Sequence, residues 1–415
     1  MPKPNSYRVT KCRICKSQNL YHFLDLGTMP IPNGFIQPEN LHRKEERFPL
    51  GTTTCLDCGL VQLTEVVNSS LMFKNYLYIP STSRTMLDHF SDVADEVVAR
   101  FSVGKDDLVI DIGSNDGSLL QFFKANQVRI LGIDPAENLV KVANLKGLNS
   151  TVGFFTVKLA QTVKKKSGSA KVITATNVLA HIDDLNDVVK GVRELLAKDG
   201  VFIIEFPYIV DLIEKTEFDT IYHEHLSYFG LWPLKQLFAR HSMRIFDAKR
   251  IDIHGGSLRI FVCFQKSTHQ STPRLNRLLN HEKVYAIHIK QTVDEFSKRV
   301  SIIKSDLLNL LKKLKKSKKS VVGYGAAAKG NVLLNYCRIG TSLLPYIVDS
   351  IPYKQGLYTP GTHIPIYPEK KLTNDQPDYV LILAWNFADE ILKKQRRYQK
   401  RGGRFILTIP KLQIV

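Results

Sequence analysis

The alternation of apolar and polar positions is most regular from residue 107 onward. Short apolar runs there alternate with stretches of helical period, which is typical of a mostly parallel sheet covered by helices. An amphipathic helix is predicted just before them, near 86–101. Gly255-Gly256 between the last two runs favours a hairpin, so the parallel sheet should end in an antiparallel pair. The predicted strands are 108–113, 129–134, 171–177, 200–206, 243–251 and 257–264.

A second α/β pattern follows a helical stretch at 275–316, which is predicted as one long helix or two. Its strands are expected within 320–330, 346–350, 379–385 and 404–410. The first 75 residues differ, because Pro and Gly turn signals in DLGTMPIPNGF indicate loop rather than helix. The fold class predicted is therefore α/β, and we expect three domains at residues 1–75, 76–270 and 271–415.

Four of the six cysteines form two knuckles, Cys12-x-x-Cys15 and Cys55-x-x-Cys58. Without a secretory signal, such pairs favour a four-cysteine zinc site over disulfides. Four thiolates complete the tetrahedron, so the Zn²⁺ would be structural. The alternative is two unrelated reduced pairs. The first domain is accordingly predicted to be a zinc-binding module.

The formal net charge of +19 favours a polyanionic partner, which could be nucleic acid, an acidic surface or a phosphorylated small molecule. The lysine runs at 164–166 and 311–319 lack interleaved aromatic residues, so they are more typical of solvated helix surfaces than of a base-stacking face. No apolar run approaches the roughly 18 residues of a membrane span, and the first residues do not form a signal peptide. A cytoplasmic protein without membrane association is expected.

A glycine loop after the first predicted strand indicates a nucleotide cofactor. The strand LVIDIG runs into Gly113-Ser114-Asn115-Asp116-Gly117 and then a helix, whose N-terminus offers free N–H groups. A carboxylate at the end of the next strand can accept the hydroxyls of an adenosine ribose. The pattern DxGxxxG is roomier than the GxGxxG that holds a pyrophosphate, which favours S-adenosylmethionine (SAM). The predicted cofactor-binding residues are Asp111, Gly113, Asn115, Gly117, Asp134 and Asn177.

The segment FDTIYHEHLSYF at 218–229 follows the last parallel strand, at the edge where open α/β sheets bind ligands. Its HEH triplet lacks the HExxH spacing of zinc proteases. In an extended backbone His223 and His225 would share one face and Glu224 the other. A neutral histidine can act as general base on a carbon next to a carbonyl. Aromatic packing at a loop surface is the alternative.

Two further candidates stay open between a functional and a structural role. Tyr76-Leu77-Tyr78 could supply a phenol that stabilises a developing enolate oxygen. His181, at a helix start, could be catalytic.

The third domain has its own fingerprint, Gly323-x-Gly325-x-x-Ala328, with Asp349 closing the next strand and Lys329 suited to a diphosphate. It matches the dinucleotide-binding pattern, although a structural turn would look the same.

Together these motifs resemble the sugar C-methyltransferases that make branched deoxysugars, such as the C-3′ enzymes of the tetronitrose and mycarose pathways. The resemblance spans essentially the whole chain and rests on CRIC…CLDC, MPIPNGF, FKNYLYIPSTSRTM, DIGSNDG, EFPY…IYHEHLSYF, HGGSLR and VVGYGAAAKGNVLL. It implies a zinc module, a SAM domain and a C-terminal Rossmann-like domain that helps to hold the substrate.

The resemblance also implies a substrate and residue roles. The acceptor would be a TDP- or GDP-linked 4-keto-deoxysugar. His225 would take the C-3 proton, Tyr222 and Glu224 would position His225, and Tyr76 would support the C-4 oxygen. Ile79-Pro80 departs from the family pattern beside these tyrosines. The implied substrate contacts are Tyr78, His181, Ser257, Arg259, Gly325, Lys329 and Asn331.

Three other functions stay open on the sequence. An RNA or DNA methyltransferase would fit the charge, but the third strand runs into TNVLAH without the Asn/Asp-Pro-Pro-aromatic motif, so no nucleic-acid partner is expected. A non-catalytic dinucleotide-binding scaffold is the second, and an O- or N-methyltransferase on a similar sugar is the third. Carbon 3 or carbon 5 as acceptor, and the oligomeric state, stay open too.

Overall fold

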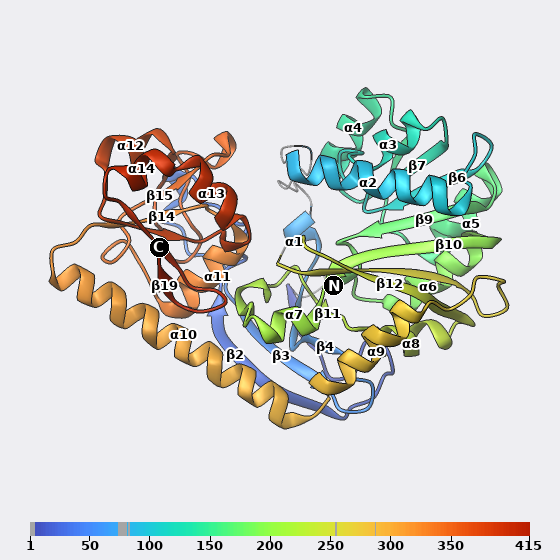
Figure 1. Cartoon of the computed structure of the whole chain (residues 1–415), viewed down its shortest axis with the longest axis horizontal. Coiled ribbons are helices and arrows are strands. Elements are labelled where there is room, and N and C mark those ends of the chain that lie inside the picture. The colour runs from blue at the N-terminus through green and yellow to red at the C-terminus, as the bar shows by residue number, and fades with distance from the viewer. Residues whose placement is uncertain (1–4, 74–80, 82–83, 254, 287) are drawn as a thin grey trace.

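The computed structural model describes residues 5–73, 81, 84–253, 255–286 and 288–415. Two lobes stand side by side above a curved sheet (Figure 1). The sheet belongs to the N-terminal module, the right-hand lobe is the central unit and the left-hand lobe is the C-terminal unit. No helix among the described residues is long and apolar enough to cross a membrane.

The N-terminal module is built from two small antiparallel sheets and a short helix, α1 (Ser70–Phe73). Strand β1 (Ser6–Arg8) pairs with β5 (Glu65–Val67). The other sheet has the order β11-β4-β3-β2, in which β11 (Ser227–Tyr228) comes from the central unit. Its remaining strands are β2 (Leu20–Met29), β3 (Phe48–Cys55) and β4 (Val61–Leu63).

The central unit is a seven-stranded mixed sheet of order β12-β13-β10-β9-β6-β7-β8. Five strands are parallel, and β13 pairs antiparallel with both β10 and β12. The second strand of the hairpin is thus inserted between its partner and the parallel strands. The strands are β6 (Leu108–Ile112), β7 (Arg129–Asp134), β8 (Ser150–Val152), β9 (Ala170–Thr176), β10 (Leu196–Pro207), β12 (Met243–Ile251) and β13 (Ser257–Phe264).

Helices cover both faces of this sheet. On one face, Phe90 of α2 and Phe123 of α3 pack with Val109, Val172 and Phe261 in an apolar core. Burying such side chains contributes roughly 1.5–3 kcal/mol each. The helices of this unit are α2 (Arg84–Phe101), α3 (Leu120–Ala125), α4 (Glu137–Leu145), α5 (Val157–Ser167), α6 (Leu185–Leu195), α7 (Ile209–Glu214) and α8 (Leu231–Ala239).

The C-terminal unit has a six-stranded sheet of order β16-β15-β14-β17-β18-β19. Its strands are β14 (Val321–Tyr324), β15 (Ile347–Asp349), β16 (Ile366–Pro368), β17 (Tyr379–Ile382), β18 (Arg404–Leu407) and β19 (Gln413–Ile414). Its helices are α10 (Lys290–Lys316), α11 (Ala328–Cys337), α12 (Lys370–Asp375), α13 (Ala388–Lys394) and α14 (Arg396–Lys400), whereas α9 (Pro273–Tyr285) packs against α8 and β12 of the central unit.

Helix α10 runs along the lower edge of the C-terminal lobe and joins it to the N-terminal module (Figure 1). Its buried residues recur every three or four positions, as an amphipathic helix requires. At its start, Phe296 packs edge-on against Phe23 of β2, with ring centroids 6.3 Å apart, and Ser297 Oγ donates to the Phe23 carbonyl at 2.6 Å. The helix therefore fixes the C-terminal unit to the sheet below it.

A second link between these parts is a strap at residues 30–36, which contains most of the motif MPIPNGF. Ile36 and Tyr358 exchange two backbone hydrogen bonds of 2.9 Å. Asn331 Nδ2 of α11 donates to the Pro32 carbonyl at 2.7 Å. The N-terminal module is thereby bound to the C-terminal unit directly.

The α/β class, the zinc-binding module and the two Rossmann-like units predicted from the sequence are confirmed. The segment DLGTMPIPNGF, predicted as loop rather than helix, contains no helix, but its first half is strand instead of loop, because β2 continues to Met29 across a bulge at Asp25–Thr28. Gly27, with a φ of 83°, allows the bulge, and a bulged strand loses the period-two pattern on which strand prediction depends. The sequence pattern also gave no sign of the short strands β8, β16 and β19.

The start of helix α8 is capped by a side chain from another helix. The buried Glu282 carboxylate of α9 accepts hydrogen bonds from the backbone N–H groups of Leu231 (2.5 Å) and Trp232 (3.0 Å), at the start of α8. Glu282→Ala leaves both donors without this partner, so we expect the free energy of unfolding to fall by about 1–3 kcal/mol. Chemical denaturation of this variant against Lys283→Ala, an exposed neighbour on α9, measures the effect. Equal stability of the two variants would contradict it.

Candidate active site

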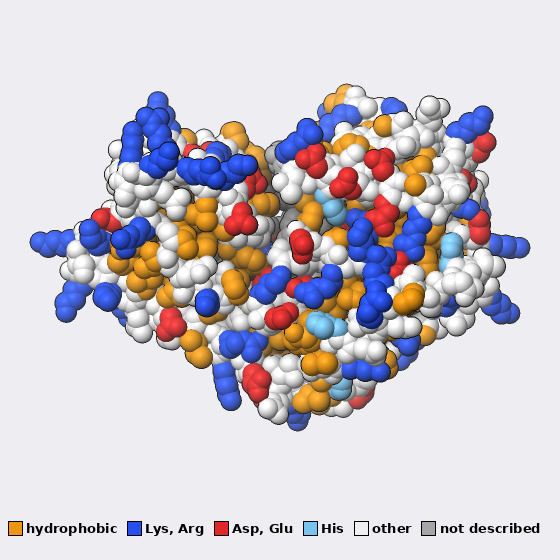
Figure 2. Space-filling view, in the orientation of Figure 1, with side chains coloured by type: hydrophobic (Ala, Val, Ile, Leu, Met, Phe, Trp, Pro, Cys, Tyr) orange, Lys and Arg blue, Asp and Glu red, His pale blue; other side chains and the backbone are white. Residues whose placement is uncertain are grey.

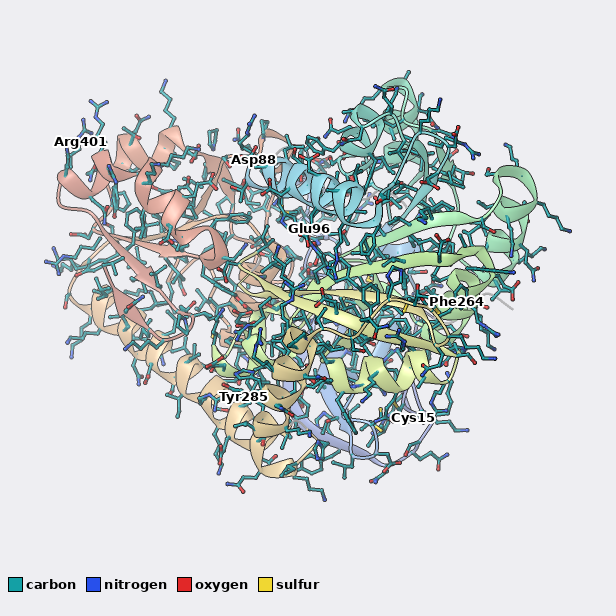
Figure 3. All side chains as sticks on the ribbon, turned by 45° about the vertical axis from the view of Figure 1, so that its right-hand side comes forward. Cys15, Asp88, Glu96, Phe264, Tyr285 and Arg401 are labelled. Atoms are coloured by element: carbon teal, nitrogen blue, oxygen red, sulfur yellow. The ribbon has the colours of Figure 1, made fainter. Side chains whose placement is uncertain are left out.

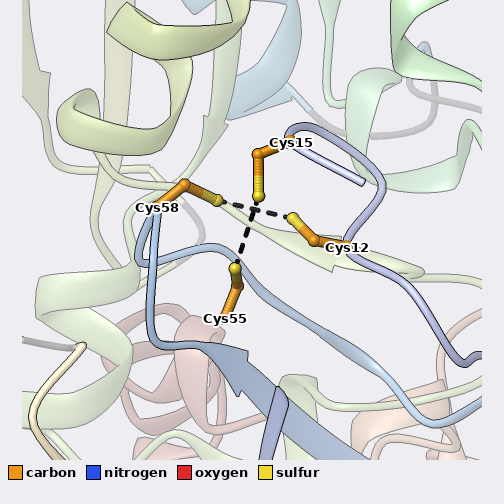
Figure 4. A group of neighbouring side chains, drawn as sticks. All are labelled: Cys12, Cys15, Cys55 and Cys58. Atoms are coloured by element: carbon orange, nitrogen blue, oxygen red, sulfur yellow. Dashed lines mark hydrogen bonds between the residues drawn. The ribbon is translucent and has the colours of Figure 1, made fainter. Parts of the chain in front are cut away.

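The four knuckle cysteines converge on one point at the end of the N-terminal sheet (Figure 4). Their sulfur atoms all lie within 4.8 Å of one another, with Cys12 and Cys58 Sγ 3.4 Å apart and Cys15 and Cys55 Sγ 3.5 Å apart. A tetrahedral zinc ion with Zn–S bonds of about 2.3 Å needs sulfurs at such separations. The donor set fits a structural Zn²⁺, because all four positions are taken by protein.

A large cavity of about 1710 Å³ opens between the central and C-terminal units, and the space-filling surface is notched between the two lobes (Figure 2). Ligand pockets for one small molecule typically have volumes of roughly 300–1,000 Å³. The cavity therefore has room for two ligands side by side. All three units line it, including Asn33 and Phe35 of the strap, Asp134 and His225 of the central unit, and Lys329 of the C-terminal unit.

The cofactor end of the cavity lies over the carboxyl ends of β6, β7 and β9. Gly113 has a φ of 72°, and a Cβ there would lie 2.2 Å from Val178 Cγ2, so no other residue fits. The Asp134 carboxylate accepts from the backbone N–H groups of Asn115 (2.9 Å) and Ala136 (2.8 Å). These bonds fix the loop and aim the carboxylate at the cavity.

Two buried polar groups at this end fit SAM. Burial raises the pKa of the Asp111 carboxyl to about 7, against the hydrogen bond of 2.7 Å that it accepts from Thr174 Oγ1. Asn177, with a φ of 57°, has a buried Oδ1 without a hydrogen-bond partner among the described residues. An unpartnered acceptor in a cavity that a buried carboxyl also lines suits an ammonium group such as that of the methionine moiety.

The predicted cofactor residues Asp111, Gly113, Asn115, Asp134 and Asn177 all line this cavity. Gly117 does not. A Cβ on Gly117 would lie 2.5 Å from Leu148 Cδ1, and its φ is 80°, so this glycine is required by the turn and its packing.

His225 lines the cavity as a residue of the central unit. Its Nδ1 is 3.0 Å from the Thr220 carbonyl oxygen, and its Nε2 is 2.9 Å from Tyr222 Oη. A carbonyl only accepts, so Nδ1 carries the proton in the neutral ring and Nε2 presents its lone pair. Tyr222, which also lines the cavity, lies against the ring with centroids 4.1 Å apart.

The extended arrangement predicted for the HEH triplet is wrong. The backbone turns at residues 223–224, with the His225 N–H bonded to the Tyr222 carbonyl at 2.9 Å, so His223 and His225 do not share a face. His223 is fully buried against Phe48, with its Nε2 3.3 Å from the Phe48 carbonyl, and burial lowers its pKa to about 4. A turn removes the period of two on which the prediction depended.

Glu224 contacts the strap rather than His225. Its Oε1 accepts a hydrogen bond of 2.6 Å from Asn33 Nδ2, and burial raises the pKa of its carboxyl to about 7, against this bond. Asn33 lines the cavity, whereas the 2 % exposed Glu224 does not. Glu224 therefore orients the Asn33 amide, a contact that the sequence interpretation did not anticipate.

His181 lines the cavity beside His225, and the two rings meet edge-on with centroids 4.9 Å apart. Burial lowers the pKa of His181 to about 4, against hydrogen bonds to the backbone of Glu224 and Asn177. His181 is thus neutral across the physiological range, and so it adds no positive charge next to His225.

The C-terminal wall repeats the plan of the cofactor end. The Asp349 carboxylate accepts from the N–H groups of Ala326 (2.6 Å) and Ile351 (2.7 Å), as Asp134 does in its loop. Gly325, with a φ of 89°, and Lys329 line this wall. Lys354 is also there, with its Nζ 2.8 Å from the Ala326 carbonyl.

Lys329 lies at the junction of the two units. Its ammonium group is 4.3 Å from the Trp385 ring centroid, and Trp385 Nε1 donates to Asp219 Oδ2 of the central unit at 2.8 Å. Burial lowers the pKa of Lys329, whereas the charges of Asp219 and Glu217 raise it.

Three predicted substrate contacts are placed elsewhere. Arg259 is buried in β13, paired with Glu205 across the strand and with Glu96 of α2 at 2.6 Å; Figure 3 labels Glu96. Ser257 Oγ donates to the Ile253 carbonyl at 2.9 Å. Asn331 holds the strap instead of lining the cavity. These residues belong to motifs that fold next to the cavity. The sequence alone does not distinguish residues that line the cavity from residues that support its walls.

Tyr76 and Tyr78 lie outside the described residues. Asn33, Asp183 and the Thr220 carbonyl, which the sequence interpretation missed, line the cavity or hold its histidine. Asn33 belongs to the motif MPIPNGF, but its role depends on contacts across 191 positions of sequence.

Comparisons with known proteins cover all three units. Residues 12–73 match a family model described as "Putative zinc binding domain", residues 86–244 a "Methyltransferase domain", and residues 252–410 a "C-methyltransferase C-terminal domain". The protein C-methyltransferase NovU of Streptomyces niveus is 34% identical over 98% of this chain and 97% of its own length. The chain belongs to the SAM-dependent C-methyltransferase family.

More distant likenesses cover less than half of the chain. A ubiquinone biosynthesis O-methyltransferase of Bordetella avium is 30% identical over 22% of this C-methyltransferase and 39% of its own length. A solved Synechocystis magnesium protoporphyrin IX methyltransferase with bound SAH covers 46% of this chain and 90% of its own, at 15% identity and a TM-score of 0.34.

The buried His223 predicts an acid-sensitive fold. Its folded pKa of about 4 lies below its ordinary value of 6.5, so its contribution is complete above pH 6.5 and is lost as the pH falls from 6.5 to about 4. His223→Gln removes this loss, which amounts to about 2–3 kcal/mol.

Denaturant unfolding at pH 7 and pH 4.5 measures this contribution, with His42→Gln, an exposed histidine of the N-terminal module, as the matched control. We expect stability to fall less between the two pH values in His223→Gln than in the wild type. Equal falls would show that His223 is not held neutral by its surroundings.

Proposed function

We propose that this C-methyltransferase methylates the carbon next to the ketone of a nucleoside-diphosphate 4-keto-deoxysugar, at C-3, with His225 as general base. The observation that carries the proposal is the His225 ring, which lines the cavity and has its Nδ1 bonded to the Thr220 carbonyl, so that Nε2 is the basic nitrogen of the neutral ring. SAM, when bound, supplies an electrophilic methyl group.

The ketone makes the base chemistry possible. A proton on a carbon next to a carbonyl is acidic because the resulting enolate spreads its charge onto the oxygen. His225 Nε2 takes that proton, and the Thr220 carbonyl accepts from Nδ1 of the imidazolium that forms. General-base assistance of this kind contributes roughly 10²–10⁴-fold to a rate.

The Tyr222 hydroxyl group has two proposed hydrogen-bond acceptors, one before and one after the substrate binds. Its hydroxyl lies 2.9 Å from Nε2 and can donate to this nitrogen before the substrate enters. Once the substrate occupies the cavity, the same hydroxyl is placed to donate to a developing oxygen anion. Tyr76, which the family resemblance implies as the partner of the C-4 oxygen, is proposed for the same task.

The C-terminal wall supports a nucleotide-linked substrate. Its loop matches the dinucleotide fingerprint, its Asp349 repeats the position of Asp134, and Lys329, Lys354 and Lys394 line the same wall. A diphosphate is favoured by such cations. TDP and GDP are the candidate nucleotides. C-methyltransferase NovU supports a carbon acceptor, and the volume of the cavity supports SAM and a second ligand together.

The test is a methyl-transfer assay with SAM and a panel of TDP- and GDP-4-keto-6-deoxysugars, followed by mass spectrometry. We expect a mass gain of one methylene on at least one sugar. His225→Asn keeps SAM affinity within about twofold but lowers turnover by at least roughly 10²-fold, because the lone pair aimed at the substrate is lost.

His288→Asn, an exposed histidine between α9 and α10, is the control and keeps full turnover. Wild-type turnover in His225→Asn would overturn the base assignment. Methyl transfer to RNA but to no sugar of the panel would overturn the substrate assignment.

A further inference from the structure

We infer that Arg13, between the zinc-ligating Cys12 and Cys15, positions the catalytic segment 222–228, so that the zinc knuckle anchors the general base. The inference deepens the proposed function and rests on it for the role of His225. The contacts that carry the inference do not depend on that role.

Arg13 reaches the residue next to the base. It is only 4 % exposed, and its Nη1 donates to the Leu226 carbonyl at 3.1 Å. The same carbonyl accepts from Leu63 N of β4 at 3.0 Å, and Leu226 N donates to the Ala180 carbonyl at 2.7 Å. Both backbone groups of Leu226 are therefore fixed, one of them by the knuckle.

The knuckle and the catalytic segment also share one strand. Gln62 of β4 is the register partner of Ser227 in β11. The Gln62 side chain accepts from Arg13 N at 2.9 Å and donates to the Lys11 carbonyl at 3.1 Å. The backbone on either side of Cys12 is thereby bonded to β4, the strand that pairs with the segment.

A second contact of the guanidinium reaches the cavity wall. Arg13 Nε lies 3.2 Å from Asp183 Oδ1, and the Tyr7 hydroxyl donates to the other oxygen of Asp183. Asp183 lines the cavity close to His181. Arg13 thus bridges two parts of the site, and burial, which lowers its pKa, is offset first by the charge of Asp183.

Arginine is the residue type that this position requires. A planar guanidinium can direct separate N–H groups at a carbonyl and a carboxylate, whereas an ammonium group on a flexible stem cannot hold both in fixed directions. Without the two directed N–H groups of Arg13, the segment 222–228 can shift. A displacement of about 1 Å between base and substrate can cost roughly 10²-fold in rate.

The experiment compares Arg13→Gln and Arg13→Lys with Lys11→Gln, which removes an exposed charge from the same knuckle. Zinc content, SAM affinity by calorimetry, hydrogen exchange of peptides covering 220–228, and kcat and KM are measured on each full-length protein. Exchange needs no substrate, so this readout stands even if the proposed sugar is wrong.

We expect Arg13→Gln to keep one zinc per chain and wild-type SAM affinity, while exchange in 220–228 rises at least tenfold and kcat falls roughly 10- to 100-fold with little change in KM. Arg13→Lys should lie between Arg13→Gln and the wild type, and Lys11→Gln should match the wild type.

Two results would overturn the inference: unchanged exchange and kcat in Arg13→Gln, or loss of zinc from Arg13→Gln and Arg13→Lys alike, which would make Arg13 a support of the metal site. If exchange rises in Arg13→Gln while His225→Asn keeps full activity, Arg13 does position the segment 222–228, but His225 is not the general base.

Discussion

The hydrogen bond between His225 Nδ1 and the Thr220 carbonyl is the interaction on which the rest of the site depends. Because a carbonyl cannot donate, this bond selects one tautomer of the neutral ring and turns the basic nitrogen toward Tyr222 and the cavity. Neutral His181 and His223 lie nearby, and burial keeps both from charging. The proposed base, His225, therefore lies near two uncharged imidazoles.

That base is held by a structure that comes from all three parts of the chain. The segment around it forms an edge strand of the N-terminal sheet, and its Glu224 is bonded to the strap through Asn33. The strap is in turn bound to the C-terminal unit. Cys15 and Arg401 mark how far apart the zinc knuckle and the outer edge of the C-terminal unit lie (Figure 3). The zinc module thus connects the two lobes that form the cavity.

The charge of the chain is unevenly distributed. Residues 271–415 hold 26 of the 58 Lys and Arg residues but only 10 of the 39 acidic ones. Many of the basic residues lie on the outside of the C-terminal lobe, where Figure 2 shows Lys and Arg side chains gathered along its upper edge. Among the described residues, few cations line the cavity, and these are the ones proposed to bind a diphosphate.

The sequence was sufficient for features that depend on local pattern. The cysteine knuckles, the loop at Gly113 and the acidic strand end at Asp134 each follow from residue type and spacing, and the structure places them as expected. The hairpin could also be predicted from the sequence. The position of β13 next to β10 could not, because strand order depends on packing rather than on neighbouring residues.

The remaining differences arise from contacts across long stretches of sequence. Arg259 and Asn331 sit in functional motifs yet bond to Glu205 and to the Pro32 carbonyl. Arg13 and Asn33 carried no signal of their own, because each acts on a residue more than 150 positions away. His223 and His225 are two positions apart and would share a face in an extended strand, but the turn at residues 223–224 separates them.

Removal of the proton from the carbon next to the ketone is the step that we propose for His225. The most direct measurement is solvent exchange of that proton, followed by NMR in D₂O with the 4-keto sugar nucleotide and S-adenosylhomocysteine in place of SAM. If His225 is the general base, deuterium is incorporated at one carbon beside the ketone with the wild type, and none above background with His225→Asn. Equal incorporation with both proteins would contradict it.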